Sequence, residues 1–302
     1  MINRKVVLIL GAGASMPYGF PSGAQLKRDV IKGLGPNGSI RRTAFQLNFT
    51  ADHINQFERS LALSATRSVD AYLEHRREFI KLGKVATACT LMPREVIDRL
   101  FKEDETDWYQ YFFHKLRSRF EEFERNRVAV VTFNYDRSLE CFLTLAIMNL
   151  YGKSQAEAAA KVQSVPIVHV YGQLGSLPSP ISVGMAFGTP ESPHLIDQAA
   201  DSIQIVHEDR PNSQNFQDAN RLIREAQTLC FVGFGYDETN LHRLLTRPED
   251  RYKEVIGSAK GLTQRESENV INIFRQIGYE NVKLDWSDGE ALSFLRKHCP
   301  FD

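Results

Sequence analysis

The stretch KVVLILGAGASMPYGFPSG, residues 5–23, decides the fold expected for this chain. Residues Val6 to Leu10 are apolar at consecutive positions, which is typical of a strand covered on both faces, as in a parallel sheet. Gly11 and Gly13 follow at once, and because they lack a Cβ atom they allow a tight turn on which a bulky group can sit. The N–H groups of such a turn, and the helix that follows it, favour negative charge. The stretch therefore predicts a buried strand followed by a turn that binds a phosphate or pyrophosphate.

This turn differs from the fingerprint of dinucleotide-binding dehydrogenases. The fingerprint has a third glycine where this chain has Met16, and about 20 residues later it has a strand ending in an acidic residue, for which no clear candidate is found. The sequence thus indicates a nucleotide-binding turn of another kind. A tight strand-to-helix turn that binds no ligand is the alternative.

Length and composition indicate a globular protein. The chain has 302 residues, of which 42% are hydrophobic, enough for one large α/β domain or two smaller ones. Lys plus Arg and Asp plus Glu both number 37, so a net charge of zero gives no electrostatic reason to expect direct binding of nucleic acid or of an anionic membrane. The longest apolar stretch, residues 141–151, is too short to span a bilayer, and no signal segment is recognised. We therefore expect a cytoplasmic protein.

The four cysteines do not have the spacing of a structural zinc site. Cys89, Cys141, Cys230 and Cys299 are too far apart to form a C-x-x-C pair, which excludes a zinc site built on such pairs. We expect each of them to be a small buried hydrophobic residue, and we expect no metal.

Five further segments have the apolar pattern of the first strand. They are residues 128–133, 165–170, 228–234, 253–258 and 281–286. Segments with helical periodicity lie between them, and the last of these opens with a capping box formed by Thr263 and Glu266. Alternating strands and helices predict an α/β fold with a doubly wound, mainly parallel Rossmann-like sheet, whose ligands bind beyond the carboxyl ends of the strands.

Residues 27–127 contain no convincing strand and are interpreted as a helical insertion between the first and second strands of a single domain, residues 1–302. Near its end, large apolar side chains form a stripe that we expect to be core or a protein contact surface. The stripe consists of Phe112, Phe113, Leu116, Phe120 and Phe123. The proline-rich segment from Gly172 to Pro193 is long enough to form a lid over a site.

Polar residues and glycines gather at the carboxyl ends of three predicted strands. They are Asn134 and Asp136 after the second strand, His169 and Gly172 at the third, and Gly233 and Gly235 at the fourth. Taken singly, Asn134 or Asp136 could cap the next helix, His169 could be a core histidine, and the glycines could belong to turns. Because parallel strands bring these ends to one edge, their joint occurrence favours a ligand site beside the first turn.

Five motifs along the chain resemble those of the sirtuin-like family. They are GAGAS (11–15), Gly19-x-Pro21, TFNYD (132–136), HVYGQLGS (169–176) and GFGYD (233–237). Within that family, the chain is most similar to the bacterial sirtuin-like domains of phage defence, and SVDAYLE (68–74) also looks like a motif of this group. The motifs occur in the expected order and span most of the chain.

The resemblance implies that the chain takes NAD+ as a substrate and breaks the bond between nicotinamide and ribose. The residues implied around the pyrophosphate are Gly11, Ala12, Gly13 and Ser15, and Gly172, Gly233 and Gly235 are further residues expected to contact NAD+. Asn134 and Asp136 are implied to hold the nicotinamide ribose and carboxamide. His169 is implied to be the general base, and we expect burial to keep it neutral. Asn134 and His169 are thus the expected catalytic residues, and the chemistry needs no metal.

Two departures from the protein-deacylating sirtuins define the expected subclass. Those enzymes carry a four-cysteine zinc module, which these cysteines do not form, and an Asp-Phe-Arg sequence where this chain has Pro21-Ser22-Gly23. We therefore expect an NAD+ hydrolase that uses water as the acceptor and depletes NAD+ in an infected cell. The alternatives are a deacylase or ADP-ribosyltransferase, and a catalytically silent nucleotide-sensing module. Because no sensor domain is evident, we expect control by homo-oligomerisation or by a separate partner protein.

Overall fold

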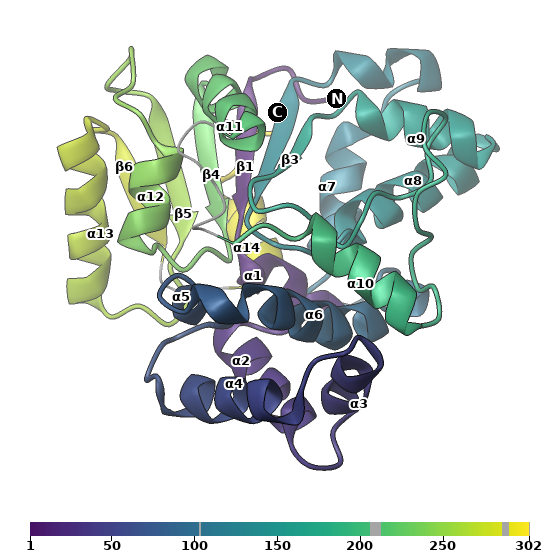
Figure 1. Cartoon of the computed structure of the whole chain (residues 1–302). Coiled ribbons are helices and arrows are strands. Elements are labelled where there is room, and N and C mark those ends of the chain that lie inside the picture. Colours follow the sequence, from purple (N-terminus) through teal and green to yellow (C-terminus); the bar gives the residue numbers. More distant parts are fainter. Residues whose placement is uncertain (103, 206–212, 286–289, 302) are drawn as a thin grey trace.

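A six-stranded, all-parallel sheet forms the centre of the protein, as shown by a computed structural model that describes residues 1–102, 104–205, 213–285 and 290–301 (Figure 1). The strands are β1 (Val6–Leu10), β2 (Val128–Thr132), β3 (Ile167–His169), β4 (Thr228–Val232), β5 (Glu254–Ser258) and β6 (Val282–Asp285). Each of the predicted strands is therefore confirmed, although β3 is shorter than expected. The last residue of the segment predicted for β6, position 286, lies outside the described residues.

The strand order β3-β2-β1-β4-β5-β6 places the first strand in the middle of the sheet. Every residue of β1 is buried, as are those of its neighbours β2 and β4, which explains the uninterrupted apolar run in the sequence. Leu10 pairs with Thr132 on one side and with Val232 on the other, so the three strands end at the same level. The chain leaves β1 for β2 on one side and returns to β4 on the other, and a crevice is expected where the strand order reverses in this way.

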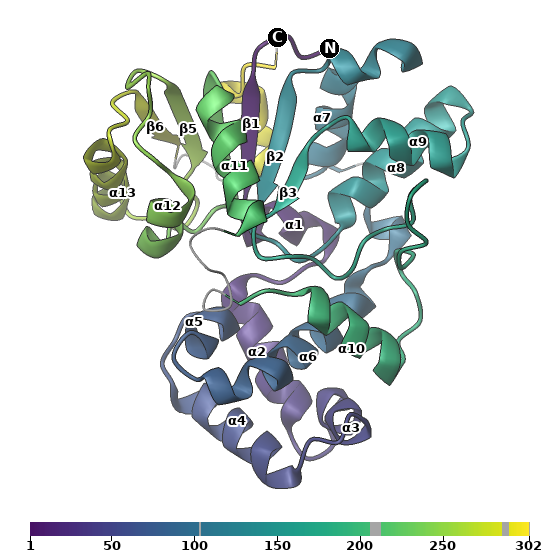
Figure 2. The same cartoon turned by 45° about the horizontal axis from the view of Figure 1, so that its top comes forward.

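Helices cover both faces of the sheet, as a doubly wound fold requires. In Figures 1 and 2, α11 (Gln214–Glu225) lies in front of the central strands and α14 (Ala291–His298) lies behind them. The remaining helices that accompany the strands are α7 (Trp108–Leu116), α8 (Ser138–Tyr151), α9 (Gln155–Gln163), α12 (Glu238–Leu244) and α13 (Gln264–Ile277). The predicted capping box is confirmed, because the Thr263 side chain accepts from the Glu266 amide and Glu266 reaches back to the Thr263 amide.

The predicted insertion between β1 and β2 is helical in the structure. The chain first forms α1 (Ala12–Ser15) and the 3-10 turn η1 (Met16–Tyr18), and the predicted insertion, residues 27–127, starts within α2 (Gly23–Leu34). It continues through α3 (Ser39–Gln46), α4 (Ala51–Leu63), α5 (Val69–Leu73), η2 (Arg77–Phe79), α6 (Ile80–Leu91), η3 (Met92–Arg94) and η4 (Ile97–Arg99) to α7. Helices α2 to α6 form a lobe facing the carboxyl ends of the strands, and α10 (Pro193–Ser202) joins this lobe by packing on α6 (Figure 2). The lobe therefore faces the edge where a ligand is expected.

The aromatic stripe near the end of the insertion is mostly core. Phe112, Leu116 and Phe123 are fully buried, whereas Phe120 is half-buried and packs on Tyr151 with ring centroids 5.6 Å apart. The stripe does not lie on one continuous helix, since α7 ends at Leu116 and three further residues precede the 3-10 turn η5 (Phe120–Arg125). In the part of the chain that the structure describes, no helix is both long enough and apolar enough to cross a bilayer.

Candidate functional site

The glycine turn after β1 packs directly against the loop that follows β4. Gly11 N donates to Val232 O at 3.1 Å, and Gly13 N donates to Gly233 O at 2.9 Å. A Cβ atom on Gly11 would lie 2.5 Å from Gly233 O, and one on Gly13 would lie 2.8 Å from Gly233 Cα, so neither position has room for a side chain. The amides of both glycines are therefore bound within the protein. They are not the free donors for a pyrophosphate that the sequence led us to expect.

A cavity of about 570 Å³, here called the switch-point cavity, opens beside this turn, where the strand order reverses. Its volume lies within the range of pockets that bind small molecules. Four of the expected ligand-binding residues line it, namely Ala12, Gly13, Gly233 and Gly235. Sequence reasoning missed Ser258, Lys260 and Glu290, which also line it. The position of the first two at the carboxyl end of a predicted strand is the signal that could have found them.

The wall of the switch-point cavity after β4 is held by a residue in an unusual conformation. Tyr236 has φ 51°, a left-handed backbone that costs free energy for a bulky side chain. Its ring is buried, and its hydroxyl donates to Ser258 O at 3.0 Å. Gly257 makes room for this hydroxyl, since a Cβ atom there would lie 2.0 Å from it. Packing on β5 thus fixes the shape of the loop that carries Gly233 and Gly235.

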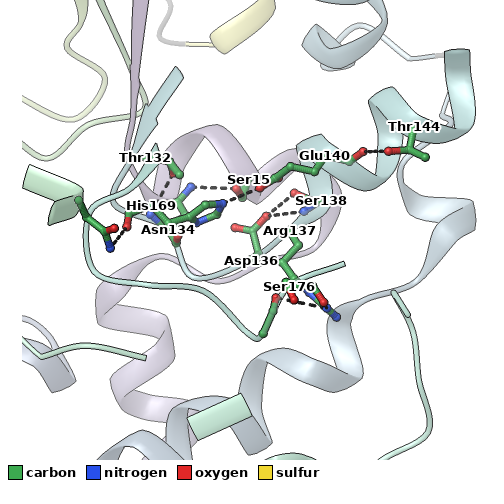
Figure 3. A network of polar contacts seen from close by, with 12 residues as sticks. Ser15, Thr132, Asn134, Asp136, Arg137, Ser138, Glu140, Thr144, His169 and Ser176 are labelled. Carbon is green, nitrogen blue, oxygen red and sulfur yellow. Dashed lines mark hydrogen bonds and ion pairs between the residues drawn. The ribbon is translucent and has the colours of Figure 1, made fainter. Parts of the chain in front are cut away.

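Asn134 connects the end of β2 to the glycine turn (Figure 3). Its side-chain amide Nδ2 donates to Gly11 O and to Ser15 Oγ, both at 2.9 Å, and its own backbone amide donates to Thr132 Oγ1 at 3.0 Å. Asn134 therefore does not cap the next helix, which was the alternative reading. Its amide group is oriented toward Ser15, one of the residues expected at the pyrophosphate.

Asp136 is buried beside Asn134 and takes part in a second set of hydrogen bonds. It accepts from the amide of Ser138 at 3.2 Å and from the Ser138 hydroxyl, and Ser138 Oγ lies 2.7 Å from the hydroxyl of Tyr109. Burial raises the pKa of Asp136, and hydrogen bonds from Ser138 and Ser15 oppose part of that rise. Asp136 thus accepts from the first residue of α8, and its carboxyl group also faces Ser15.

His169 has an acceptor at both of its ring nitrogens. Nδ1 lies 2.8 Å from the backbone oxygen of Asn134, and Nε2 lies 2.6 Å from Oε1 of Glu140 (Figure 3). Burial by itself lowers the pKa of His169, but the Glu140 carboxylate and the two hydrogen bonds raise it by more, so the pKa lies above its ordinary value of 6.5. The expectation considered burial alone, whereas Glu140 shifts the pKa of His169 in the opposite direction.

The predicted site residues are close together but do not share one open cavity. Asn134, Asp136 and His169 surround a void of about 10 Å³, together with Ser15 and other residues, whereas Gly13, Gly233 and Gly235 line the switch-point cavity. Such a void holds about one water molecule. We call the group of Ser15, Tyr109, Asn134, Asp136, Ser138, Glu140 and His169 the polar cluster; Asn134 and Glu140 are half-buried, and the other five are buried. The short helix α1 separates it from the switch-point cavity, since Ala12 and Gly13 border the cavity and Ser15 borders the void.

Gly172 lies outside both spaces and has a packing role. Its φ is 71°, and a Cβ atom there would lie 2.1 Å from Ser202 O. It forms an isolated bridge with Ile203, just beyond α10. The glycine therefore allows the chain after β3 to pass close to the end of α10.

The segment between Gly172 and α10 is bound through its backbone to a buried ion pair. Arg137 donates to Glu95 from two nitrogens, at 2.9 and 2.6 Å, and also to Met185 O at 2.6 Å, while Glu95 accepts from the amide of Gly188 at 3.1 Å. The segment lines a third space, a cavity of about 520 Å³ along the free edge of β3, here called the β3-edge cavity. The residues that line the switch-point cavity come from other segments. The expected lid thus borders a different cavity from the one beside the glycine turn.

All four cysteines are buried free thiols, as expected. Among the residues that the structure describes, no group of three or more His, Cys, Asp or Glu side chains is arranged to hold a metal ion. Comparison of the chain with models of known protein families gives no match, and comparison with curated proteins gives none either.

Proposed function

We propose that this protein is an NAD+ hydrolase that cleaves the bond between nicotinamide and ribose to release nicotinamide and ADP-ribose. The observation that carries the proposal is the location of two spaces at the carboxyl edge of a parallel sheet. A cavity large enough for part of a nucleotide lies at the point where the strand order reverses, and the polar cluster lies directly behind the turn that borders it. The choice of NAD+ as the substrate comes from the resemblance to sirtuin-like domains.

The side chains of the polar cluster suit the chemistry of this cleavage. Loss of nicotinamide leaves a ribose with oxocarbenium character, which an oriented amide and a base can direct water to trap. The Nδ2 group of Asn134 is held by hydrogen bonds to Gly11 O and to Ser15 Oγ, so its Oδ1 can accept from water or a ribose hydroxyl. His169 can accept a proton once one of its ring nitrogens is unprotonated and no longer bonds to Asn134 O or Glu140 Oε1. Substrate therefore has to open the polar cluster, whose void of about 10 Å³ is smaller than a nicotinamide ring.

Incubation with NAD+, followed by chromatography for nicotinamide and ADP-ribose, tests the proposal. We expect His169→Ala and Asn134→Ala each to lower turnover by about 10²-fold or more, which is typical for loss of a base or an orienting group. Both variants should still bind NAD+ within about tenfold of the wild type, a difference of ~1.4 kcal/mol. Asn134→Asp is a useful companion, because it keeps the size of the side chain but loses the donor that bonds Gly11 O and Ser15 Oγ.

The same assay distinguishes the other functions. Nicotinamide release that requires an acetylated peptide would point to a deacylase, and ADP-ribose found on a protein would point to a transferase. Binding of NAD+ without any release of nicotinamide would indicate a nucleotide-sensing module. Near wild-type release from His169→Ala would leave the proposed mechanism without its base. As a wider role, we propose that the hydrolase depletes NAD+ during phage infection, which rests on the resemblance alone.

A further inference from the structure

Glu140 is the one member of the polar cluster, among the described residues, that also lines the β3-edge cavity. It lies on the first turn of α8, and its side chain is 18% exposed, whereas that of His169 is 6% exposed. The Glu140 carboxylate therefore contacts the buried imidazole on one side and the β3-edge cavity on the other. His169 and Glu140 come from different elements, β3 and α8, so the sheet topology brings them together.

The two acceptors around His169 determine both the orientation of the ring and its protonation. A backbone carbonyl only accepts, so Nδ1 carries a proton that it donates to Asn134 O. Nε2 faces a carboxylate oxygen at 2.6 Å, and with Glu140 ionised this nitrogen also carries a proton. With both nitrogens protonated, the ring would be an imidazolium paired with a carboxylate. A protonated ring cannot act as a general base until it has lost one proton.

We propose that Glu140 is the positioning residue of His169 and the route by which its proton leaves. The Nε2–H bond breaks and the proton forms an O–H bond with Oε1 of Glu140, which leaves a neutral ring that keeps Nδ1–H on Asn134 O. The carboxylic acid then releases the proton to water in the β3-edge cavity and becomes a carboxylate again. No electrons are gained or lost in either step. The role in turnover rests on the proposed function, but the link between Glu140 and the protonation of His169 does not.

The other charged groups near His169 and Glu140 either also raise the pKa of His169 or are paired with a charge of opposite sign. Asp136, on the loop between β2 and α8, adds a second negative charge that favours the protonated ring. On α11, Asn215 donates to the backbone oxygen of His169 and is uncharged, and Asp218 lies in the β3-edge cavity paired with Arg221 at 3.0 Å. Removing the charge of Glu140 leaves burial as the main influence, and burial lowers the pKa of His169.

The decisive measurement is an NMR titration of His169 in the full-length wild type, in Glu140→Gln and in Glu140→Asp. Histidine labelled with ¹³C reports the ring protonation, and a His169→Gln variant assigns the signal. We expect the titration midpoint to fall to lower pH in Glu140→Gln. Glu140→Asp keeps the charge and should fall between the two. Asp218→Asn is the matched control, because it removes a carboxylate from the same cavity whose partner is Arg221, and its midpoint should equal that of the wild type.

Turnover provides the second readout. If His169 is the base, the acidic limb of the kcat/KM profile for nicotinamide release should move to lower pH in Glu140→Gln, by the same amount as the NMR midpoint. An unchanged midpoint in Glu140→Gln overturns the proposal, whatever the activity. A lower midpoint with an unmoved acidic limb shows that Glu140 is a structural partner only, and it overturns the role in turnover. Absence of nicotinamide release from the wild type contradicts the proposed function instead, because the titration measures the pair without turnover.

Discussion

At the scale of single residues, the glycines of the first turn are explained by contact between two loops. Gly11 and Gly13 pack on Gly233 so closely that a Cβ atom on either would overlap its backbone. The prediction that this turn needs residues without side chains is confirmed, but the atoms that pack against it belong to the loop after β4. Gly235 is different, since a Cβ atom there would meet no atom within 4 Å, and it lines the switch-point cavity.

This difference gives a prediction at the residue scale. Gly13→Ala should destabilise the fold by about 1–3 kcal/mol, the cost of overpacking a close contact, whether or not NAD+ is present. Gly235→Val should leave stability nearly unchanged but place a side chain in the cavity, so it should reduce the rise in melting temperature that NAD+ produces. Thermal unfolding with and without NAD+ measures both effects. Full NAD+ protection in Gly235→Val would remove this cavity from the proposed site.

At the scale of elements, the segment between β3 and α10 is held both by buried apolar side chains, such as Leu174 and Met185, and by backbone hydrogen bonds to a buried ion pair. Ile181 and Val183 in this segment are 87% and 92% exposed, while the carbonyl of Met185 and the amide of Gly188 bond to the pair formed by Arg137 and Glu95. Burial raises the pKa of Glu95, and Arg137 opposes part of that rise. The pair thus joins the helical insertion, the start of α8 and this segment.

Breaking this pair should release the segment. We expect Arg137→Met to destabilise the protein by about 3–5 kcal/mol, because it leaves the Glu95 carboxylate buried without its partner. Adding Glu95→Met should recover part of that loss. Limited proteolysis should cut residues 176–188 faster in the single variant than in the wild type. The exposed pair of Arg125 and Glu122 is the control, since Arg125→Ala should change stability by less than about 1 kcal/mol. Equal proteolysis in Arg137→Met and the wild type would show that the segment is held by other contacts.

At the scale of the whole molecule, the polar cluster is closed while the cavity beside it is open. Its side chains bond one another around a void of about 10 Å³, so substrate entry has to break some of these bonds. We therefore expect the purified chain to be a slow enzyme when dilute, and an assembled oligomer or a complex with a partner to be much faster. Sizing and assaying the same fractions over a range of protein concentrations tests this. Full turnover in a dilute monomer would contradict it.

The fold was predictable because its signals are local. Apolar runs such as Val6 to Leu10 indicate strands that are buried on both faces of a sheet. The helices between them form crossover connections between parallel strands, so all the strands end at the same edge of the sheet. The capping box at Thr263 is equally local, since both of its partners lie within one turn. For the same reason, the sequence could indicate which residues gather near the glycine turn.

The sequence by itself determined the parallel sheet, the helical insertion and the edge at which Asn134, Asp136 and His169 meet. Only the tertiary structure decided what these side chains bond to. The partner of His169 is Glu140, on another element, and the partner of Gly13 is the loop after β4. Such contacts depend on how strands and helices pack across the sheet, at distances of a few ångström that no periodicity encodes. The upward shift of the His169 pKa follows from one of these contacts, and burial alone gave the opposite direction.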